Sequence, residues 1–150
     1  MNSNLPNEKT YYDLIADTEN TWDIPEDEEI KYFEIEEEVE QIMINLGMNF
    51  PLNQRSFEWF IELIMLAIYS PNSWQKDCFE SIGNRENLTR ERVRQTLYKA
   101  AWNNWHKDSK SILEKHFGYP VQAQFEHIKP NHIEFVELIS NELRKKHIHE

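Results

Sequence analysis

The sequence predicts an all-α fold: a six-helix bundle that contains a helix-turn-helix and follows an acidic N-terminal arm. With 150 residues, the chain has the length of one domain. It holds only three glycines and few β-branched runs, which favours helices with short connections over strands with tight turns. Apolar residues recur every three or four positions between residues 35 and 143, the spacing of helices that bury one face.

Residues 1–33 are expected to form the arm, and residues 34–150 the helical domain. The arm contains Pro6, Pro25 and the acidic run 26–29, without a sustained helical period. The first 40 residues carry 14 acidic and 2 basic side chains, a net charge of −12, whereas the whole chain has a net charge of −11. The acidity therefore belongs to the N-terminal segment. Its aromatic residues suggest that parts of the arm dock on the domain, and a solvated acidic tail is the alternative.

Three helices are expected in the first half of the domain. The first covers about residues 34–46 and stops at Gly47. The second covers about 54–69 and is apolar on nearly every side, which is typical of a central buried helix. The third covers about 73–83. Its inward residues are expected to be Trp74, Cys78, Phe79 and Ile82.

A polar link at residues 84–88 separates these helices from the next two. Thr89 is the expected N-cap of a helix over about 90–105. A short amphipathic helix over about 109–117 follows it. Helix, link and helix in this order are typical of a helix-turn-helix unit.

The last helix is expected to start at Pro130-Asn131, after a looser stretch at 118–129. Asn131 and Glu134 stand at capping-box spacing there. The inner stripe of this helix is expected to be Ile133, Val136, Ile139 and Leu143. We expect the end of the chain, residues 144–150, to fray.

The helix over 90–105 has two different faces. Small and aliphatic residues on one side suit packing against a neighbouring helix; they are Val93, Leu97, Ala100 and Asn104. The other side is polar and aromatic, with Glu91, Arg92, Gln95, Tyr98, Lys99 and Trp102. Such residues suit a recognition helix, because Arg reads guanine, Gln reads adenine, and Lys and Tyr hold phosphates. A surface helix with an ordinary charged face is the alternative.

The surroundings of this helix are basic although the chain is acidic. Residues 85–115 hold eight basic and four acidic side chains, a net charge of +4. Charges more than about 10 Å away are largely screened at physiological salt, so such a patch can still bind phosphate.

An ordered series of motifs resembles the C-terminal effector domain of the stage-zero sporulation protein A family of bacterial response regulators. The series runs over about residues 38–147. It comprises Leu46-Gly47, the second helix ending at Tyr69, Arg92-Val93, Trp105, Phe117-Gly118-Tyr119, Val121, Lys129-Pro130-Asn131, Glu134-Phe135 and Leu143.

The resemblance implies a six-helix domain whose fourth helix enters the major groove, with pairs of domains on tandem DNA sites. With the charge pattern it gives these DNA-binding candidates: Arg90, Arg92, Arg94, Gln95, Tyr98 and Lys99, with Arg85, Lys107 and Lys110 as flanking phosphate contacts. The family also touches the sigma subunit of RNA polymerase through a patch that maps here to Ile112, Phe117 and Val121.

Several positions depart from the family. Gln95 and Tyr98 stand where the family has Arg, Arg94 stands where it has Glu, and Trp102 replaces a charged residue. A different DNA site, or a protein contact on this face, is therefore expected. The acidic N-terminus is too short for the family's receiver domain, so we expect no phosphoryl control through one.

Other kinds of site are not expected. The six histidines form no HExxH-like pattern, Cys78 suits a core position better than a nucleophile, and three glycines could hardly build a phosphate loop. We therefore expect no enzyme, no metal and no cofactor.

The N-terminus lacks the basic start and apolar run of a signal peptide, and no apolar stretch reaches the length of a membrane span. We therefore expect a cytoplasmic protein without membrane contact.

Two functional hypotheses follow. The first is a sequence-specific transcriptional regulator that binds double-stranded DNA, as a homodimer on tandem sites, and is restrained by the acidic arm. Deletion of residues 1–33 should then tighten DNA binding. The alternative is a protein-interaction module that has lost DNA binding and antagonises or adapts RNA polymerase or a related regulator.

Overall fold

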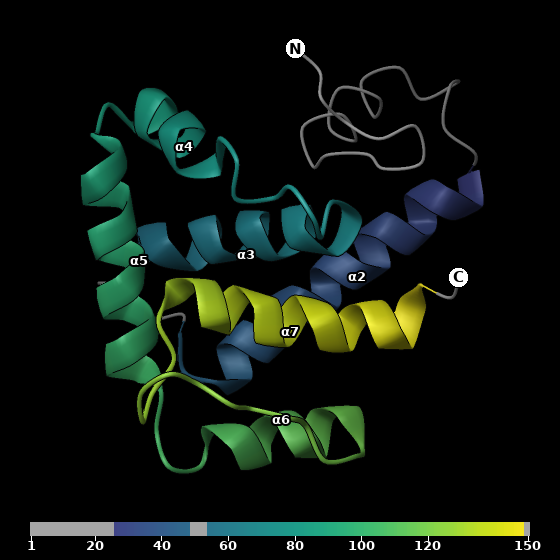
Figure 1. Ribbon diagram of the computed structural model, residues 1–150. Coiled ribbons are helices and arrows are strands. Elements are labelled where there is room, and N and C mark those ends of the chain that lie inside the picture. Colours follow the sequence, from purple (N-terminus) through teal and green to yellow (C-terminus); the bar gives the residue numbers. More distant parts are fainter. Residues whose placement is uncertain (1–25, 49–53, 149–150) are drawn as a thin grey trace.

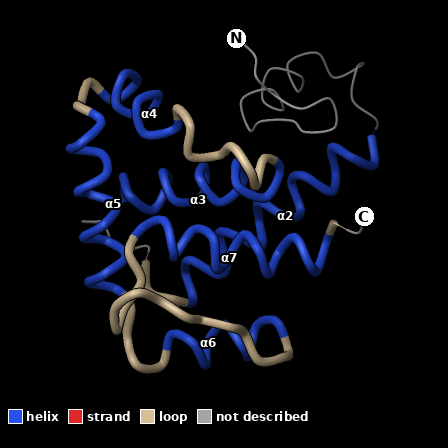
Figure 2. The backbone as a smooth tube through the Cα atoms, in the orientation of Figure 1, coloured by secondary structure: helices blue, strands red, loops and turns tan. Residues whose placement is uncertain are grey.

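The computed structural model describes residues 26–48 and 54–148, and over these ranges the chain forms six helices and no strand (Figures 1 and 2). The all-α prediction is confirmed. The helices are α2 (Glu26–Asn45), α3 (Gln54–Tyr69), α4 (Cys78–Glu86), α5 (Arg90–Asn104), α6 (Ser109–Phe117) and α7 (His132–His147). None of the helices in the described ranges is both long and apolar enough to cross a membrane.

α3 lies at the centre of the fold, as its sequence predicts. Phe60, Leu63 and Ile64 have no exposed surface. α7 runs beside α3 (Figure 1), and the rings of Phe60 and Phe135 meet edge to face at 5.0 Å. α2 and α5 also contact α3, so one apolar core holds the helices together.

α2 begins about eight residues before the predicted start at residue 34. The acidic run 26–29, which was expected in an arm, forms the first turn of this helix. Tyr32 is only 7% exposed and stacks on Tyr69 at 5.6 Å. The expected arm therefore overlaps α2, and its residues 1–25 lie outside the described ranges. Gly47 ends this helix in a left-handed conformation (φ +82°), as expected.

α4 begins later than the predicted residue 73 and ends later than residue 83. Residues 71–77 form turns instead, with hydrogen bonds from Ser73 N to the Ser70 carbonyl and from Lys76 N to the Ser73 carbonyl. Trp74 anchors these turns in the core, where it is 3% exposed. Trp74 thus resembles the first residue of a helical stripe in sequence, but it reaches the core from a loop.

The remaining boundaries follow the sequence. The Thr89 side chain accepts a hydrogen bond from Arg92 N at 3.1 Å and caps α5. Asn131 and Glu134 form both bonds of the predicted capping box at the start of α7. α6 ends at Gly118, whose φ of +84° suits glycine.

The last turn of α7 is helical to His147, so the expectation that the chain frays from residue 144 is wrong for residues 144–147. Arg144 donates a hydrogen bond to the Ile68 carbonyl at the end of α3, where helical carbonyls lack partners within their own helix. Lys146 and His147 reach α2 instead. Both contact the carboxylate of Glu38 at 2.7 Å.

We call the group formed by Glu38, His116, Lys146 and His147 the carboxylate clasp. His116 of α6 also lies 2.7 Å from Glu38, so one carboxylate joins α2, α6 and α7. Burial alone would raise the pKa of Glu38, but the hydrogen bonds from Lys146, His116 and His147 outweigh it and lower the pKa to about 2. Glu38 is therefore ionised in the folded protein at neutral pH.

Candidate nucleic-acid interface

A short turn joins α4 to α5. Asn87 adopts the left-handed conformation (φ 62°, ψ 43°) after the last turn of α4, and Leu88 N donates to the Gly83 carbonyl at 2.8 Å. Thr89 then starts α5. In Figure 1 the two helices leave this turn in clearly different directions, and they pack against each other.

Gly83 makes this turn possible. A Cβ atom at this position would lie 2.5 Å from the backbone oxygen of Leu88 and 3.4 Å from the carbonyl carbon of Thr89. Both neighbours are backbone atoms, so they cannot rotate away as a side chain could. Glycine at residue 83 therefore sets how closely the start of α5 approaches α4.

α5 buries one side and exposes the other, largely as predicted. Val93, Leu97, Ala100 and Ala101 are buried, and the Asn104 amide donates to the Ala100 carbonyl at 2.8 Å. The exposed residues form what we call the outer row: Arg90, Arg92, Gln95, Tyr98 and Lys99. Glu91 is also exposed, so α5 as a whole carries four cations and one carboxylate, a net charge of +3.

Arg94 does not belong to the outer row. Its side chain is half-buried, and its guanidinium carbon lies 5.3 Å from the centre of the Phe79 ring on α4. Arginine over an aromatic face makes a favourable cation–π contact. Arg94 was predicted to bind DNA, but in the structure it holds α5 against α4.

Aromatic side chains continue from the outer row toward α7. Tyr98 is 38% exposed and meets Trp102 edge to face at 5.9 Å. Lys129 lies 5.8 Å above the Trp102 ring. Trp102, expected on the outer face, is therefore half-buried and covered on one side by a lysine.

His132 lies beneath the outer row at the start of α7. It is 8% exposed, lies 5.5 Å from Phe79 and 6.5 Å from Tyr98, and neither ring nitrogen has a hydrogen-bond partner among the described residues. Burial, and secondly the charge of Arg94, lower the pKa of His132 to about 4. The imidazole is therefore neutral at physiological pH.

The three residues predicted as flanking phosphate contacts differ in whether a carboxylate already binds them. Arg85 binds both carboxylate oxygens of Glu62 on α3, at 3.1 and 2.8 Å, and lies 3.5 Å from Glu86. Its guanidinium therefore joins α4 to α3 in this structure. Lys107 is exposed, and Lys110 is exposed with Glu114 4.0 Å away.

The expected sigma-like patch is only partly exposed. Ile112 and Phe117 are half-buried, whereas Val121 is 3% exposed and belongs to the core. Val121 N donates to Glu114 at 3.0 Å, which holds the loop after α6 against that helix. Of the three predicted residues, only Ile112 and Phe117 have surface that a partner could contact.

Sequence reasoning missed Arg55. A polar pocket of about 430 Å³ beside the outer row is lined by Arg55 of α3 and by Thr96, Lys99 and Asn103 of α5, among others. The Arg55 guanidinium lies 5.5 Å from the centre of the Trp59 ring. Residues 55 and 99 are far apart in sequence, so only the packing of α3 on α5 brings the two cations to one pocket.

Cys78 is confirmed as a core residue. It is 1% exposed, and burial raises the pKa of its thiol to about 12. The described ranges contain no group of three His, Cys, Asp or Glu side chains arranged to hold a metal ion.

No family model, no curated protein and no solved structure matches the chain. The resemblance to the sporulation regulator family therefore rests on the sequence motifs alone.

Proposed function

We propose that the chain is a sequence-specific transcriptional regulator that binds double-stranded DNA and inserts α5 into the major groove. The observation that carries the proposal is the outer row of α5, in which cations and hydrogen-bonding side chains share one exposed face. The opposite face of α5 is fixed in the core, so these side chains project from a rigid support. Sequence-specific DNA binding needs both features, charge for the phosphates and positioned hydrogen-bonding groups for the bases.

The outer row divides into base-reading and phosphate-binding candidates. Arg92 and Gln95 are the base readers, because Arg pairs with the guanine edge and Gln with the adenine edge. Arg90, Tyr98 and Lys99 are phosphate contacts, and Arg55 extends this set across the polar pocket. Lys107 and Lys110 remain flanking candidates. Arg85 is the weakest, since Glu62 holds its guanidinium.

A selection from random duplexes followed by a salt titration tests the proposal. Full-length protein should enrich one motif, and the logarithm of its affinity should fall linearly with the logarithm of salt concentration. Arg92→Ala should weaken binding to that motif by about 1–3 kcal/mol and relax one base position. Lys115→Ala is the control, because Lys115 is exposed on α6, away from the outer row. Absence of binding at low salt would refute the proposal.

Because α2 begins at Glu26 and not at residue 34, the proposed restraint of DNA binding by the acidic N-terminal segment is assigned to residues 1–25. Of the net charge of −12 in the first 40 residues, −8 lies in residues 26–40 within α2, and −4 in residues 1–25. Deletion of residues 1–33 would remove Tyr32 from the core, so the deletion that tests an acidic brake ends before Glu26. A brake in residues 1–25 predicts tighter DNA binding at low salt after that deletion.

A second candidate function, a protein-interaction module acting on RNA polymerase or a related regulator, is supported by the aromatic surface beside the outer row. Tyr98 and Trp102 are partly exposed there, and Ile112 and Phe117 add apolar surface on α6. Purified polymerase holoenzyme is the direct probe. Binding that is lost in Tyr98→Ala and kept in Arg92→Ala would favour this function over DNA binding.

A further inference from the structure

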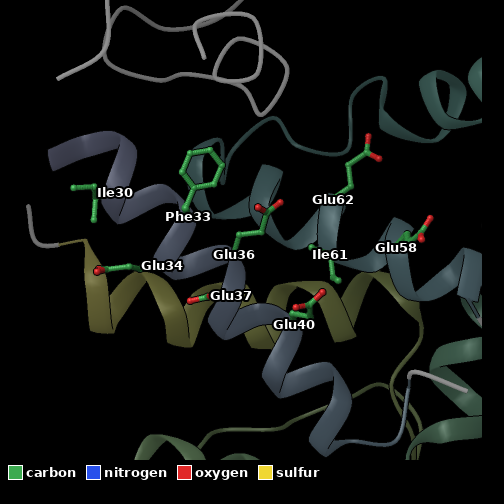
Figure 3. A pocket seen from close by; sticks show the side chains of 9 residues that line it. All are labelled: Ile30, Phe33, Glu34, Glu36, Glu37, Glu40, Glu58, Ile61 and Glu62. Atoms are coloured by element: carbon green, nitrogen blue, oxygen red, sulfur yellow. The ribbon is translucent and has the colours of Figure 1, made fainter. Parts of the chain in front are cut away.

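An open groove of about 710 Å³ lies along α2 and α3 (Figure 3). Its apolar surface comes from Ile30, Phe33 and Ile61. Ile30 is 50% exposed and Phe33 is 47% exposed, which is high for large apolar side chains in a folded domain.

Glutamates edge this apolar surface. Six of the nine residues that line the groove are glutamates. Glu62 binds Arg85, but among the described residues no cation lies within ion-pair distance of Glu36, Glu37 or Glu40. Burial, and secondly repulsion by the charge of Glu40, raise the pKa of Glu36. A cationic occupant would relieve this repulsion.

The acidic stripe on α2 and the outer row of α5 are similar in length. Phe33, Glu36, Glu37 and Glu40 stand at positions i, i+3, i+4 and i+7, so they share one helical face about 10 Å long. Within the outer row, Arg92, Gln95 and Lys99 stand at positions i, i+3 and i+7, so they cover an equal length of α5. Each stripe also carries one exposed aromatic ring, Phe33 on α2 and Tyr98 on α5.

The two stripes cannot meet within one molecule. α5 lies at one end of the fold, and α2 begins at the other end and runs through the middle (Figure 1). Both helices are held in the same core, which prevents them from swinging together. Only a second copy of the chain can bring an outer row to the groove.

We propose that the groove binds the outer row of α5 from a second copy of this chain. The contact is head to tail, because each copy offers one groove and one outer row on different sides. Such contacts do not close on themselves in a dimer, so association continues beyond two copies as concentration rises. The contact covers the face assigned to DNA, so self-association and DNA binding compete. That competition rests on the proposed function, whereas the contact itself does not.

Sedimentation equilibrium of the full-length chain without DNA tests the contact. The weight-average mass should rise with concentration above the 18.2 kDa of one chain, and added salt should reverse the rise. Glu37→Lys with Glu40→Lys, and separately Arg92→Glu with Lys99→Glu, should each weaken association by at least about tenfold. All four side chains are exposed, and far-UV circular dichroism checks that the variants stay helical.

A one-to-one mixture of the two charge-reversed variants gives the decisive result. Each variant alone carries like charges on groove and outer row, but the mixture pairs opposite charges again and should associate like the unmodified chain. Glu80→Lys with Glu126→Lys is the matched control for the groove variant, because it makes the same change in net charge as Glu37→Lys with Glu40→Lys at exposed sites outside both stripes. Ile30→Ser with Phe33→Ser should weaken association, and Ile128→Ser, at an 86% exposed residue, should not.

A monomer at all concentrations would overturn the proposal, as would association that the control variant weakens equally or that the mixture does not restore. None of these measurements contains DNA. Failure of self-association therefore leaves the proposed DNA binding standing, and failure of DNA binding leaves self-association standing.

Discussion

α2 and α5 are both half-buried helices, yet they carry opposite charge. α2 has nine acidic residues and one lysine, and α5 has four cations and one carboxylate. Each helix uses one charged side chain to hold the fold: Glu38 in the carboxylate clasp, and Arg94 over Phe79. Most of the other charged side chains that the structure describes on these two helices are exposed. The net charge of −11 therefore describes neither surface, and the charge of each helix face is the better guide to a partner.

The largest expected effect is on the pH dependence of folding stability, because a buried histidine beneath α5 and the carboxylate of Glu38 on α2 lose their contributions in different pH ranges. His132, under α5, has a pKa of about 4 when folded against about 6.5 when unfolded, so the unfolded state binds more protons between these values. Its contribution to stability is complete above pH 6.5 and is lost as pH falls toward 4, by about 3 kcal/mol in total. Urea unfolding at a series of pH values measures this loss.

A substitution identifies the group responsible. His132→Phe should flatten the pH dependence between 6.5 and 4, and His127→Phe, at an exposed histidine, should leave it unchanged. An equal slope in the His132→Phe variant would show that other groups cause the loss. The clasp responds in a lower window, because Glu38 has a lowered pKa of about 2 and its contribution disappears only below about pH 4.5.

The next effect concerns the turn that positions α5. Gly83→Ala should destabilise the fold by about 2 kcal/mol, although alanine usually favours a helix, because the new Cβ meets the Leu88 carbonyl at 2.5 Å. Gly118→Ala is the comparison: nothing lies within 4 Å of its Cβ, so it costs only the left-handed backbone strain, roughly 1 kcal/mol. Urea unfolding measures both. A stabilising Gly83→Ala would show that the turn moves without cost.

The corresponding change on the α2 side is Glu38→Gln. It removes the anionic partner of Lys146 and two histidines, and we expect a loss of roughly 1.5 kcal/mol at pH 7. Glu40→Gln, at an exposed position of the same helix, should change stability by less than about 0.5 kcal/mol. Equal effects of the two substitutions would mean that the clasp contributes no more than an ordinary surface charge.

The smallest effect is on DNA affinity. Lys99→Ala should weaken binding by about 1 kcal/mol, nearly equally for all sequences, and reduce the salt slope by about one. The exposed Lys31→Ala on α2 should change neither quantity. A loss of base preference in Lys99→Ala would move this residue from the phosphate contacts to the base readers.

The features that were predicted correctly from the sequence are those that depend on residues close together in the chain. The apolar run of α3, the Thr89 cap and the capping box of Asn131 and Glu134 each depend on residues within a few positions of one another, and all three were predicted. The start of α2 was not, because an acidic run is typical both of a solvated arm and of a helical first turn. Trp74 misled the prediction of α4, since a loop can bury a large side chain as well as a helix can.

The groove and the carboxylate clasp could not be predicted from the sequence. Glu38 meets His116 and His147 across separations of 78 and 109 residues, and no short-range pattern relates these positions. The exposure of Phe33 depends on how α2 lies on α3. The outer row of α5 was predictable, because one helix contains all of it.

The carboxylate clasp has a consequence for the order of folding during synthesis. Residue 38 leaves the ribosome long before residues 146 and 147, and closing so long a loop carries a large entropic cost that the core must first offset. A nascent chain that ends inside α7 has two of the three partners of Glu38 missing. The clasp therefore forms only after residue 147 has been synthesised, and a stop codon before residue 146 would leave Glu38 without either of its partners from α7.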